Sequence, residues 1–176
     1  MLNNKASYRY AQALFSLAQE QKIQDTILMD CKFVLSEFNQ TEELFKLIKN
    51  PTIKKDFKKR LFEKIFSNKI EKVTMNFIGL LLKKGRESLL PMILENYNLL
   101  YNKEKNIILA EVVSSKPLDE DLINRIKDKL RGLGRVTLKE KLDPKILGGF
   151  IIKIGDLQYD ASVKKQINNV KRAFKL

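Results

Sequence analysis

Residues 107–113 read IILAEVV, and this stretch marks a change in the secondary structure that the chain encodes. Its branched and apolar residues predict a β-strand. Before it, apolar residues recur at helical spacing up to about residue 105. After it, short strand patterns and helical patterns alternate. We therefore predict an α+β fold, with a six-helix bundle over residues 1–105 and a small α/β domain over residues 106–176.

Six helical segments are predicted before residue 105, and most begin or end at a residue that favours a helix terminus. Thr41, Thr52 and Ser88 are candidate N-caps, because a hydroxyl oxygen can accept a hydrogen bond from the first free N–H groups. Pro51 ends the third segment, and Gly85 ends the fifth. The predicted segments are 5–21, 24–38, 41–50, 52–66, 70–84 and 88–105.

The chain is strongly basic, with 34 Lys and Arg against 21 Asp and Glu and a net charge of +13. A basic helical nucleic-acid-binding protein is therefore the alternative function. Such a protein would place aromatic side chains on its basic face, whereas Phe57, Phe62 and Phe66 fall at spacings typical of a core. We interpret the densest basic cluster as mostly the exposed side of one helix. The cluster contains Lys54, Lys55, Lys58, Lys59, Arg60 and Lys64.

The last seventy residues predict a small unit that mixes strands and helices. Asp119 begins a helix that ends near Gly132, and strand patterns follow at 136–139, 150–154 and 157–159. Ser162 caps a final helix, whose apolar stripe contains Val163, Ile167, Val170 and Phe174. A core of this size is marginal by itself, so we expect the unit to dock against something else.

The composition argues against an enzyme. The chain has no His and only one Cys, Cys31, so the usual base of hydrolase triads and the commonest metal ligand are missing. We interpret Cys31 as a small core residue. The glycines of 132–134 and 148–149 are too sparse for a phosphate-binding loop. We predict no catalytic residues, no metal and no cofactor.

Two helices carry more apolar surface than one core needs. In the first, Ala11, Phe15 and Ala18 share one side, while Ala6, Tyr10, Ala13, Leu14 and Leu17 lie on the other. The fifth is apolar nearly all round. Such helices are buried on both sides. Either they are central in the bundle, or they border an open groove that receives an amphipathic helix from a partner.

Several short motifs, taken in order, resemble one known family. The chain is similar to the delta subunit of F-type ATP synthases, called the oligomycin-sensitivity-conferring protein in mitochondria. In the first 120 residues the similar motifs are YAQALF at 10–15, Asn50-Pro51, Gly85-Arg86, Leu90-Pro91, Ser114-Ser115 and Pro117-Leu118. The C-terminal motif is the most specific, and it comprises Asp143-Pro144, Leu147-Gly148-Gly149-Phe150, Ile154-Gly155-Asp156 and Asp160-x-Ser162-Val163.

The resemblance implies a non-catalytic subunit of the peripheral stalk. Its N-terminal domain would bind the N-terminal helix of an alpha subunit, and its C-terminal domain would hold the b-type stalk subunits, one copy serving each complex. No nucleic acid and no small-molecule substrate is expected. The resemblance places Tyr10 and Ala13, with Leu14 and Leu17, on the groove-forming first helix. For the fifth helix we infer the lane Asn76, Gly79, Leu80 and Lys83, because it mixes small and polar residues.

The location follows from the same resemblance. No apolar run approaches the roughly 18 residues of a membrane-spanning helix, and the N-terminus has no pattern of a signal peptide. We therefore expect a peripheral membrane protein on the cytoplasmic face of a bacterial inner membrane. The chain is more basic than we expect of the family, which leaves open whether its stalk partners are unusually acidic.

Overall fold

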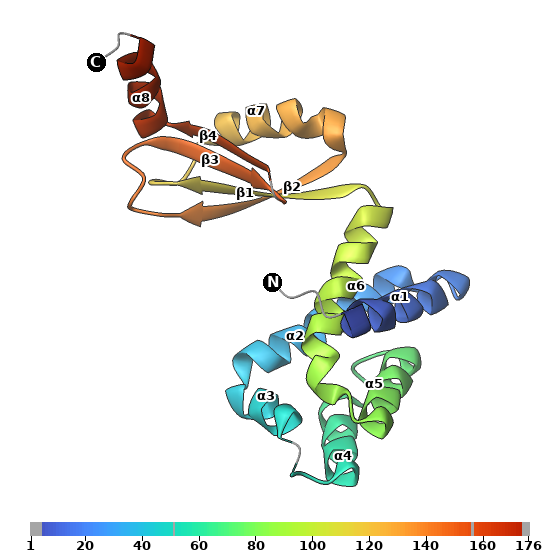
Figure 1. The fold of residues 1–176 in the computed structure, drawn as a ribbon. Coiled ribbons are helices and arrows are strands. Elements are labelled where there is room, and N and C mark those ends of the chain that lie inside the picture. The colour runs from blue at the N-terminus through green and yellow to red at the C-terminus, as the bar shows by residue number, and fades with distance from the viewer. Residues whose placement is uncertain (1–4, 51, 156, 174–176) are drawn as a thin grey trace. The chain divides into compact units, whose positions relative to one another are not determined.

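The computed structural model describes residues 5–50, 52–155 and 157–173, and it forms two compact units, Met1–Tyr101 and Asn102–Leu176 (Figure 1). The first unit is helical and the second contains a four-stranded mixed sheet with helices, so the chain has the predicted α+β class. Pro51, Asp156 and Phe174, which the sequence singled out, lie outside the described residues.

The helices of the first unit follow the predicted segments closely. Their bounds are α1 (Lys5–Glu20), α2 (Gln24–Gln40), α3 (Glu42–Lys49), α4 (Lys55–Phe66), α5 (Lys72–Lys84), the 3-10 turn η1 (Glu87–Leu89) and α6 (Leu90–Glu104). Gly85 ends α5 as predicted, in the left-handed conformation with φ +66°. None of the helices in the described part of the chain is both long enough and apolar enough to span a bilayer.

One continuous core occupies the helical unit. Apolar side chains from α1 to α6 meet in it, and Cys31 is fully buried among them as predicted. Aromatic rings pack edge to face across the core, with 5.4 Å between the centroids of Phe15 and Tyr97. Such pairs add about 0.5–1.5 kcal/mol each beyond the burial of their area.

Two predicted caps are wrong. The fourth helix begins at Lys55, with Lys54 at the N-cap position, and Thr52 lies in the turn before it, where its backbone N–H donates to Asn50 Oδ1 at 2.9 Å. Ser88 lies inside η1, and α6 begins only at Leu90. Thr41 does precede α3 as its N-cap residue, although its side chain makes no capping hydrogen bond.

The buried face of α4 also differs from the prediction. Phe57 is 55% exposed, whereas Phe62 and Phe66 are buried. Lys58 shares their face, one turn before Phe62, and is only 1% exposed. Its ammonium donates to Glu87 Oε1 at 2.7 Å and to the Ile48 carbonyl oxygen at 2.9 Å. Lys58 is thus part of the interior and not of the exposed basic face.

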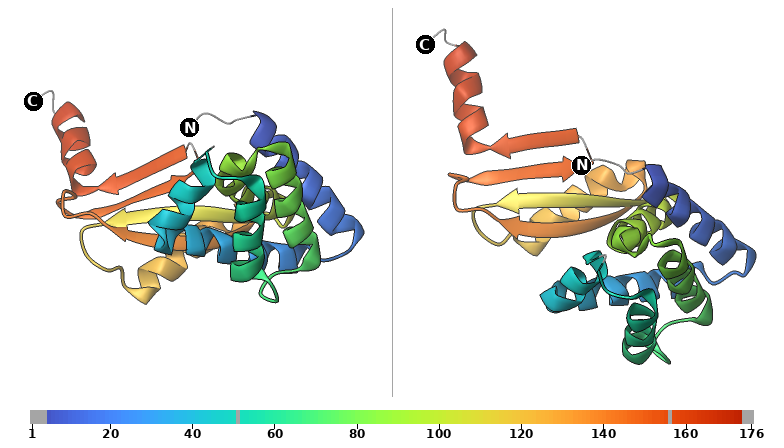
Figure 2. Two further views of the ribbon diagram at one scale, coloured as in Figure 1. Left: turned by 90° about the horizontal axis from the view of Figure 1, so that it is seen from below. Right: turned by 60° about the horizontal axis from the view of Figure 1, so that its bottom comes forward.

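The second unit contains a sheet of strand order β2-β1-β3-β4, and α7 connects β1 to β2 along the chain and lies outside the sheet (Figure 2). Its elements are β1 (Ile107–Ser114), α7 (Glu120–Leu130), the turn η2 (Arg131–Leu133), β2 (Arg135–Leu142), β3 (Gly149–Ile154), β4 (Leu157–Ser162) and α8 (Val163–Ala173). Strands β1 and β2 are parallel from the pair Ile107–Arg135 onward, and the other pairings are antiparallel. The apolar face of α7 packs on one face of this sheet, around Ile126, Val112 and Ile152.

Candidate functional site

The exposed lane of α1 is a candidate binding surface. Ala13 and Leu17 are exposed and Tyr10 is half-buried, as a groove requires. Leu14 differs, because it is only 1% exposed and belongs to the core together with Ala11. Residues three positions apart on a helix share a face, so the core side of α1 includes Leu14. We therefore remove Leu14 from the predicted partner-binding residues.

Tyr10 connects α1 to α5 and to Arg86, which follows α5. Its ring lies edge-on to Phe77, with 6.3 Å between centroids, and its hydroxyl oxygen accepts a hydrogen bond from Arg86 Nη1 at 3.3 Å. The Arg86 guanidinium also lies 5.5 Å from the ring centroid, within cation–π range. We call the surrounding surface the Tyr10 hollow. It is lined by Lys5, Ala6, Arg9, Tyr10, Ala13 and Arg86.

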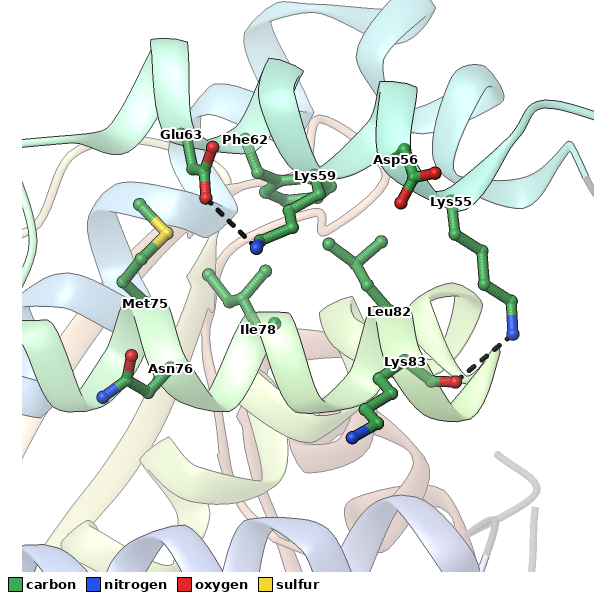
Figure 3. A pocket seen from close by; sticks show the side chains of 11 residues that line it. Lys55, Asp56, Lys59, Phe62, Glu63, Met75, Asn76, Ile78, Leu82 and Lys83 are labelled. Atoms are coloured by element: carbon green, nitrogen blue, oxygen red, sulfur yellow. Dashed lines mark hydrogen bonds and ion pairs between the residues drawn. The ribbon is translucent and has the colours of Figure 1, made fainter.

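The predicted lane of α5 is accessible, but it borders a different hollow. Asn76, Leu80 and Lys83 are exposed and Gly79 is half-buried. All except Leu80 line a groove of about 520 Å³ between α4 and α5, the α4–α5 groove (Figure 3). Tyr10 and Ala13 of α1 thus line one hollow, and Asn76, Gly79 and Lys83 of α5 line another.

The α4–α5 groove has an apolar floor and a charged rim. Phe62, Ile78 and Leu82 contribute to the floor. On the rim, the Lys59 ammonium lies 3.8 Å from a Glu63 carboxylate oxygen, and both side chains are exposed. A Cβ atom added to Gly79 would meet nothing within 4 Å. The small residue therefore leaves this side of α5 open to an approaching helix.

The reactive groups of the described residues do not form a catalytic site. Burial raises the pKa of the Cys31 thiol far above its ordinary value, which keeps the thiol protonated. Burial likewise raises the pKa of Tyr97. Within the described ranges, no group of three or more His, Cys, Asp or Glu side chains could hold a metal ion.

The C-terminal motif brings strands β3 and β4 close together. Gly149 has φ +77°, and a Cβ atom there would lie 2.4 Å from the Ala161 carbonyl oxygen. Only glycine permits this approach. Gly155, with φ +55°, forms the turn that leads into β4. Leu147 is exposed just before these strands. The motif glycines therefore shape the backbone.

The rest of the motif starts the last helix. Val163 N–H donates to the Gly148 carbonyl oxygen at 3.0 Å, and Ser162 N–H donates to Asp160 Oδ1 at 2.9 Å. Ser162 Oγ then accepts from Lys165 N–H at 3.3 Å, which confirms the predicted cap. Hydrogen bonds from the side chain and backbone of Ser162 lower the pKa of Asp160.

A second apolar groove lies between α7 and the edge of the sheet. Residues Phe150, Ile152, Leu157 and Tyr159 line this α7–β4 groove, which has a volume of about 930 Å³. Leu157 is 75% exposed and Tyr159 is 66% exposed. Sequence reasoning missed this site, although Tyr159 pairs with Ile152 and so shares its face of the sheet. The alternation of apolar residues across the β3–β4 turn was the available indication.

Known proteins of one family resemble the chain over nearly its whole length. The sequence model of the ATP synthase delta (OSCP) subunit family matches residues 6–174. The ATP synthase subunit delta of Cytophaga hutchinsonii is 34% identical over 175 residues, covering 99% of this chain and 96% of the relative. The ATP synthase subunit delta of Crocosphaera subtropica is 39% identical over 165 residues, which cover 92% of this chain and 89% of the relative.

A solved structure shares the fold. A chain in the cryo-EM structure of the Toxoplasma gondii mitochondrial ATP synthase hexamer superposes with a TM-score of 0.75 and 20% sequence identity, covering 97% of both chains. This likeness supports the observed fold alone, whereas the sequence matches carry the assignment. The chain belongs to the ATP synthase delta (OSCP) subunit family.

Proposed function

We propose that this chain, a non-catalytic peripheral-stalk subunit of an F-type ATP synthase, connects two different partners. Residues 1–105, as a six-helix bundle, would bind the catalytic head, and residues 106–176 would bind the b-type stalk subunits. Holding both at once prevents the head from turning with the rotor, so that proton translocation is coupled to ATP synthesis. The whole-length family match carries this proposal, and two separate kinds of exposed apolar surface support it.

The head contact is proposed along α1 and α5. The partner is the N-terminal helix of an alpha subunit, and the residues are Tyr10, Ala13 and Leu17 on α1 and Asn76, Gly79, Leu80 and Lys83 on α5. Their accessibility supports this assignment. The small side chains of Ala13 and Gly79 would let a foreign helix approach closely.

The stalk contact is proposed on the second unit. Its α7–β4 groove exposes Leu157 and Tyr159, which is the apolar surface that a partner segment would cover. The motif residues Gly148, Gly149 and Ser162 would act indirectly, because their contacts set the geometry of β3, β4 and α8.

The proposed location is the cytoplasmic face of a bacterial inner membrane, with one copy of the chain in each complex. The family assignment associates the chain with a membrane-bound complex. Holding two partners also raises the effective concentration at each contact, so one copy in each complex is enough. The nucleic-acid alternative is not favoured, since the family match accounts for the whole chain.

The test is to tag the chain in its native cells, solubilise the membranes gently and purify through the tag. We expect a large ATPase-active complex with alpha, beta and b subunits. Ala13→Asp should release the head and keep the b subunits, because it places a charge in the Tyr10 hollow, where the partner helix would pack. Gln12→Asp is the matched control, since Gln12 is also exposed on α1. Recovery of the chain alone, or with nuclease-sensitive material, would overturn the proposal.

A further inference from the structure

Helix α5 begins with Lys72, Val73 and Thr74, so its first turn carries a cation and no carboxylate. Its N-cap residue, Glu71, makes no side-chain capping hydrogen bond within this fully described helix. A cation at the N-terminal end opposes the helix dipole, and the first N–H groups of a helix lack partners within it. Helix α7, by contrast, has two acidic residues in its first turn. The N-terminal end of α5 therefore needs an acceptor from another element.

Asp30 of α2 provides this acceptor. Its Oδ2 atom accepts one hydrogen bond from the backbone N–H of Glu71 at 2.9 Å and another from the hydroxyl of Thr74 at 2.6 Å. Asp30 is 6% exposed and Thr74 is fully buried. Burying a carboxylate is costly unless hydrogen bonds and opposite charge compensate, and donors at the positive end of a helix provide both. Two residues 41 positions apart in the sequence are thus joined by this cap.

The two hydrogen bonds fix the position of α5 along its own axis. Sliding the helix by one residue moves it by about 1.5 Å, which is more than the spread of hydrogen-bond lengths allows. At the other end, the Lys55 ammonium donates to the Lys83 carbonyl oxygen at 3.3 Å, but this contact is exposed and water competes with it. The Asp30 contacts end at Thr74, just before the predicted lane of α5 begins at Asn76. Asp30 is therefore the buried anchor of that lane.

We propose that Asp30 is a positioning residue for the contact with the catalytic head. It is too deeply buried to touch a partner helix, so it acts through α5. A helix that packs closely against the small residues Ala13 and Gly79 requires α1 and α5 at one separation, because packed interfaces tolerate little displacement. Without the Asp30 cap, α5 would occupy the fitting position for a smaller fraction of the time, and the apparent affinity would fall by that fraction. This inference rests on the proposed head contact.

The experiment titrates labelled full-length chains with the purified catalytic head from which this chain has been removed. Asp30→Ala deletes the acceptor, Asp30→Asn keeps one acceptor oxygen without the charge, and Thr74→Val deletes one donor with little change of shape. Val34→Ala is the matched control, because Val34 is fully buried on the same helix, one turn later. Urea unfolding measures the stability of every variant. A parallel titration uses the detergent-solubilised membrane sector with its b-type subunits.

We expect Asp30→Ala to weaken head binding by about tenfold, since one hydrogen bond to a charged group changes an equilibrium by about that factor. Asp30→Asn and Thr74→Val should each weaken it by about twofold to fivefold. Val34→Ala should weaken it by less than about twofold, because the chain stays predominantly folded. The membrane sector should bind every variant with unchanged affinity. Hydrogen exchange of the Glu71 N–H should accelerate by about tenfold in Asp30→Ala, and more than exchange of the α1 amides.

Equal weakening by Asp30→Ala and Val34→Ala at equal loss of stability would overturn the inference alone, because stability would then explain the effect. Unchanged head binding by a folded Asp30→Ala chain would overturn it too. If Asp30→Ala does not fold, Asp30→Asn and Thr74→Val decide, and no effect of either variant on head binding would overturn the inference. A wild-type chain that failed to bind the head would overturn the proposed head contact as well.

Discussion

The two units of this chain use their apolar residues differently. The helical unit packs side chains from helices α1 to α6 into one core. Among the described residues, the central cluster of the second unit contains four buried apolar residues, Ala110, Val112, Ile126 and Ile152. The exposed apolar residues of this unit include Leu157 and Tyr159 on β4 and Val163, Ile167 and Val170 on α8. A unit that keeps its apolar surface outside depends on a partner for part of its stability.

The largest expected effect tests burial directly. Phe66 is fully buried in the helical core, so Phe66→Ala should lower the free energy of unfolding by about 3–5 kcal/mol. Leu157→Ala in the second unit should change it by less than about 0.5 kcal/mol, because that side chain is mostly exposed. Urea unfolding of both full-length variants measures the difference. Similar losses for the two would remove the contrast between the units.

Breaking an ion pair should also cost more folding free energy in the helical unit than in the second unit. Lys58→Met leaves the buried Glu87 carboxylate without its ammonium partner and should cost about 3–5 kcal/mol of folding free energy. Adding Glu87→Leu should recover much of that loss, because the buried charge is then gone. In the second unit, Lys141→Met breaks a 4.0 Å pair with Glu111 nearer the surface and should cost less than about 1 kcal/mol. Chemical denaturation checks all three, and a small effect of Lys58→Met would argue against an interior pair.

Two glycines sharpen the comparison at the level of the backbone. Gly149→Ala forces a Cβ atom against the Ala161 carbonyl oxygen at positive φ, so the second unit should lose about 1–3 kcal/mol. Gly79→Ala meets open space inside a helix and should stabilise the first unit by about 0.5–1 kcal/mol. Hydrogen exchange of the full chain assigns each change to its unit. Tolerance of alanine at 149 would contradict the close approach of β3 and β4.

The smallest expected effect depends on pH. Because the pKa of Asp160 is lowered in the folded chain, its charged form contributes stability above the ordinary aspartate pKa of about 4, and this contribution is lost as the pH falls through the lowered value. Asp160→Asn keeps an acceptor oxygen but removes the charge. The wild type should therefore have a higher melting temperature than the variant near neutral pH, and the difference between the two melting temperatures should decrease in acid. Differential scanning calorimetry measures both melting temperatures. A difference between them that widened in acid would contradict the conclusion that the charged form of Asp160 stabilises the fold.

Much of the fold could be predicted from the sequence, because its elements are bounded by strong local features. The strand at 107–113 and the helix end at Gly85 appear where expected. The buried face of α4 could not be predicted, because the helix has two possible apolar stripes. Phe57 begins one stripe, while Lys58, Phe62 and Phe66 form the other, and a lysine in a stripe normally indicates solvent. The tertiary partners of Lys58, the Glu87 carboxylate and the Ile48 carbonyl oxygen, allow the second stripe to be the buried one.

The candidate site was predictable to a lesser degree. The family resemblance pointed to Ala13 and Leu17 on α1, and the mixture of small and polar residues pointed to Leu80 on α5, and all three are accessible. Leu14 lies near the border between two faces of α1 and is buried. The α7–β4 groove depends on which helix covers which part of the sheet. Such an arrangement depends on long-range packing, which local patterns do not encode.

The central position of β1 has a mechanical consequence for a subunit that resists torque. Only residues 105–106 separate α6 from β1, which is hydrogen-bonded to β2 on one side and to β3 on the other. Ladder hydrogen bonds run across the strands. The component of any tension that acts along β1 therefore loads both ladders in shear, where many bonds share the force. An edge strand pulled sideways would instead lose its bonds one after another.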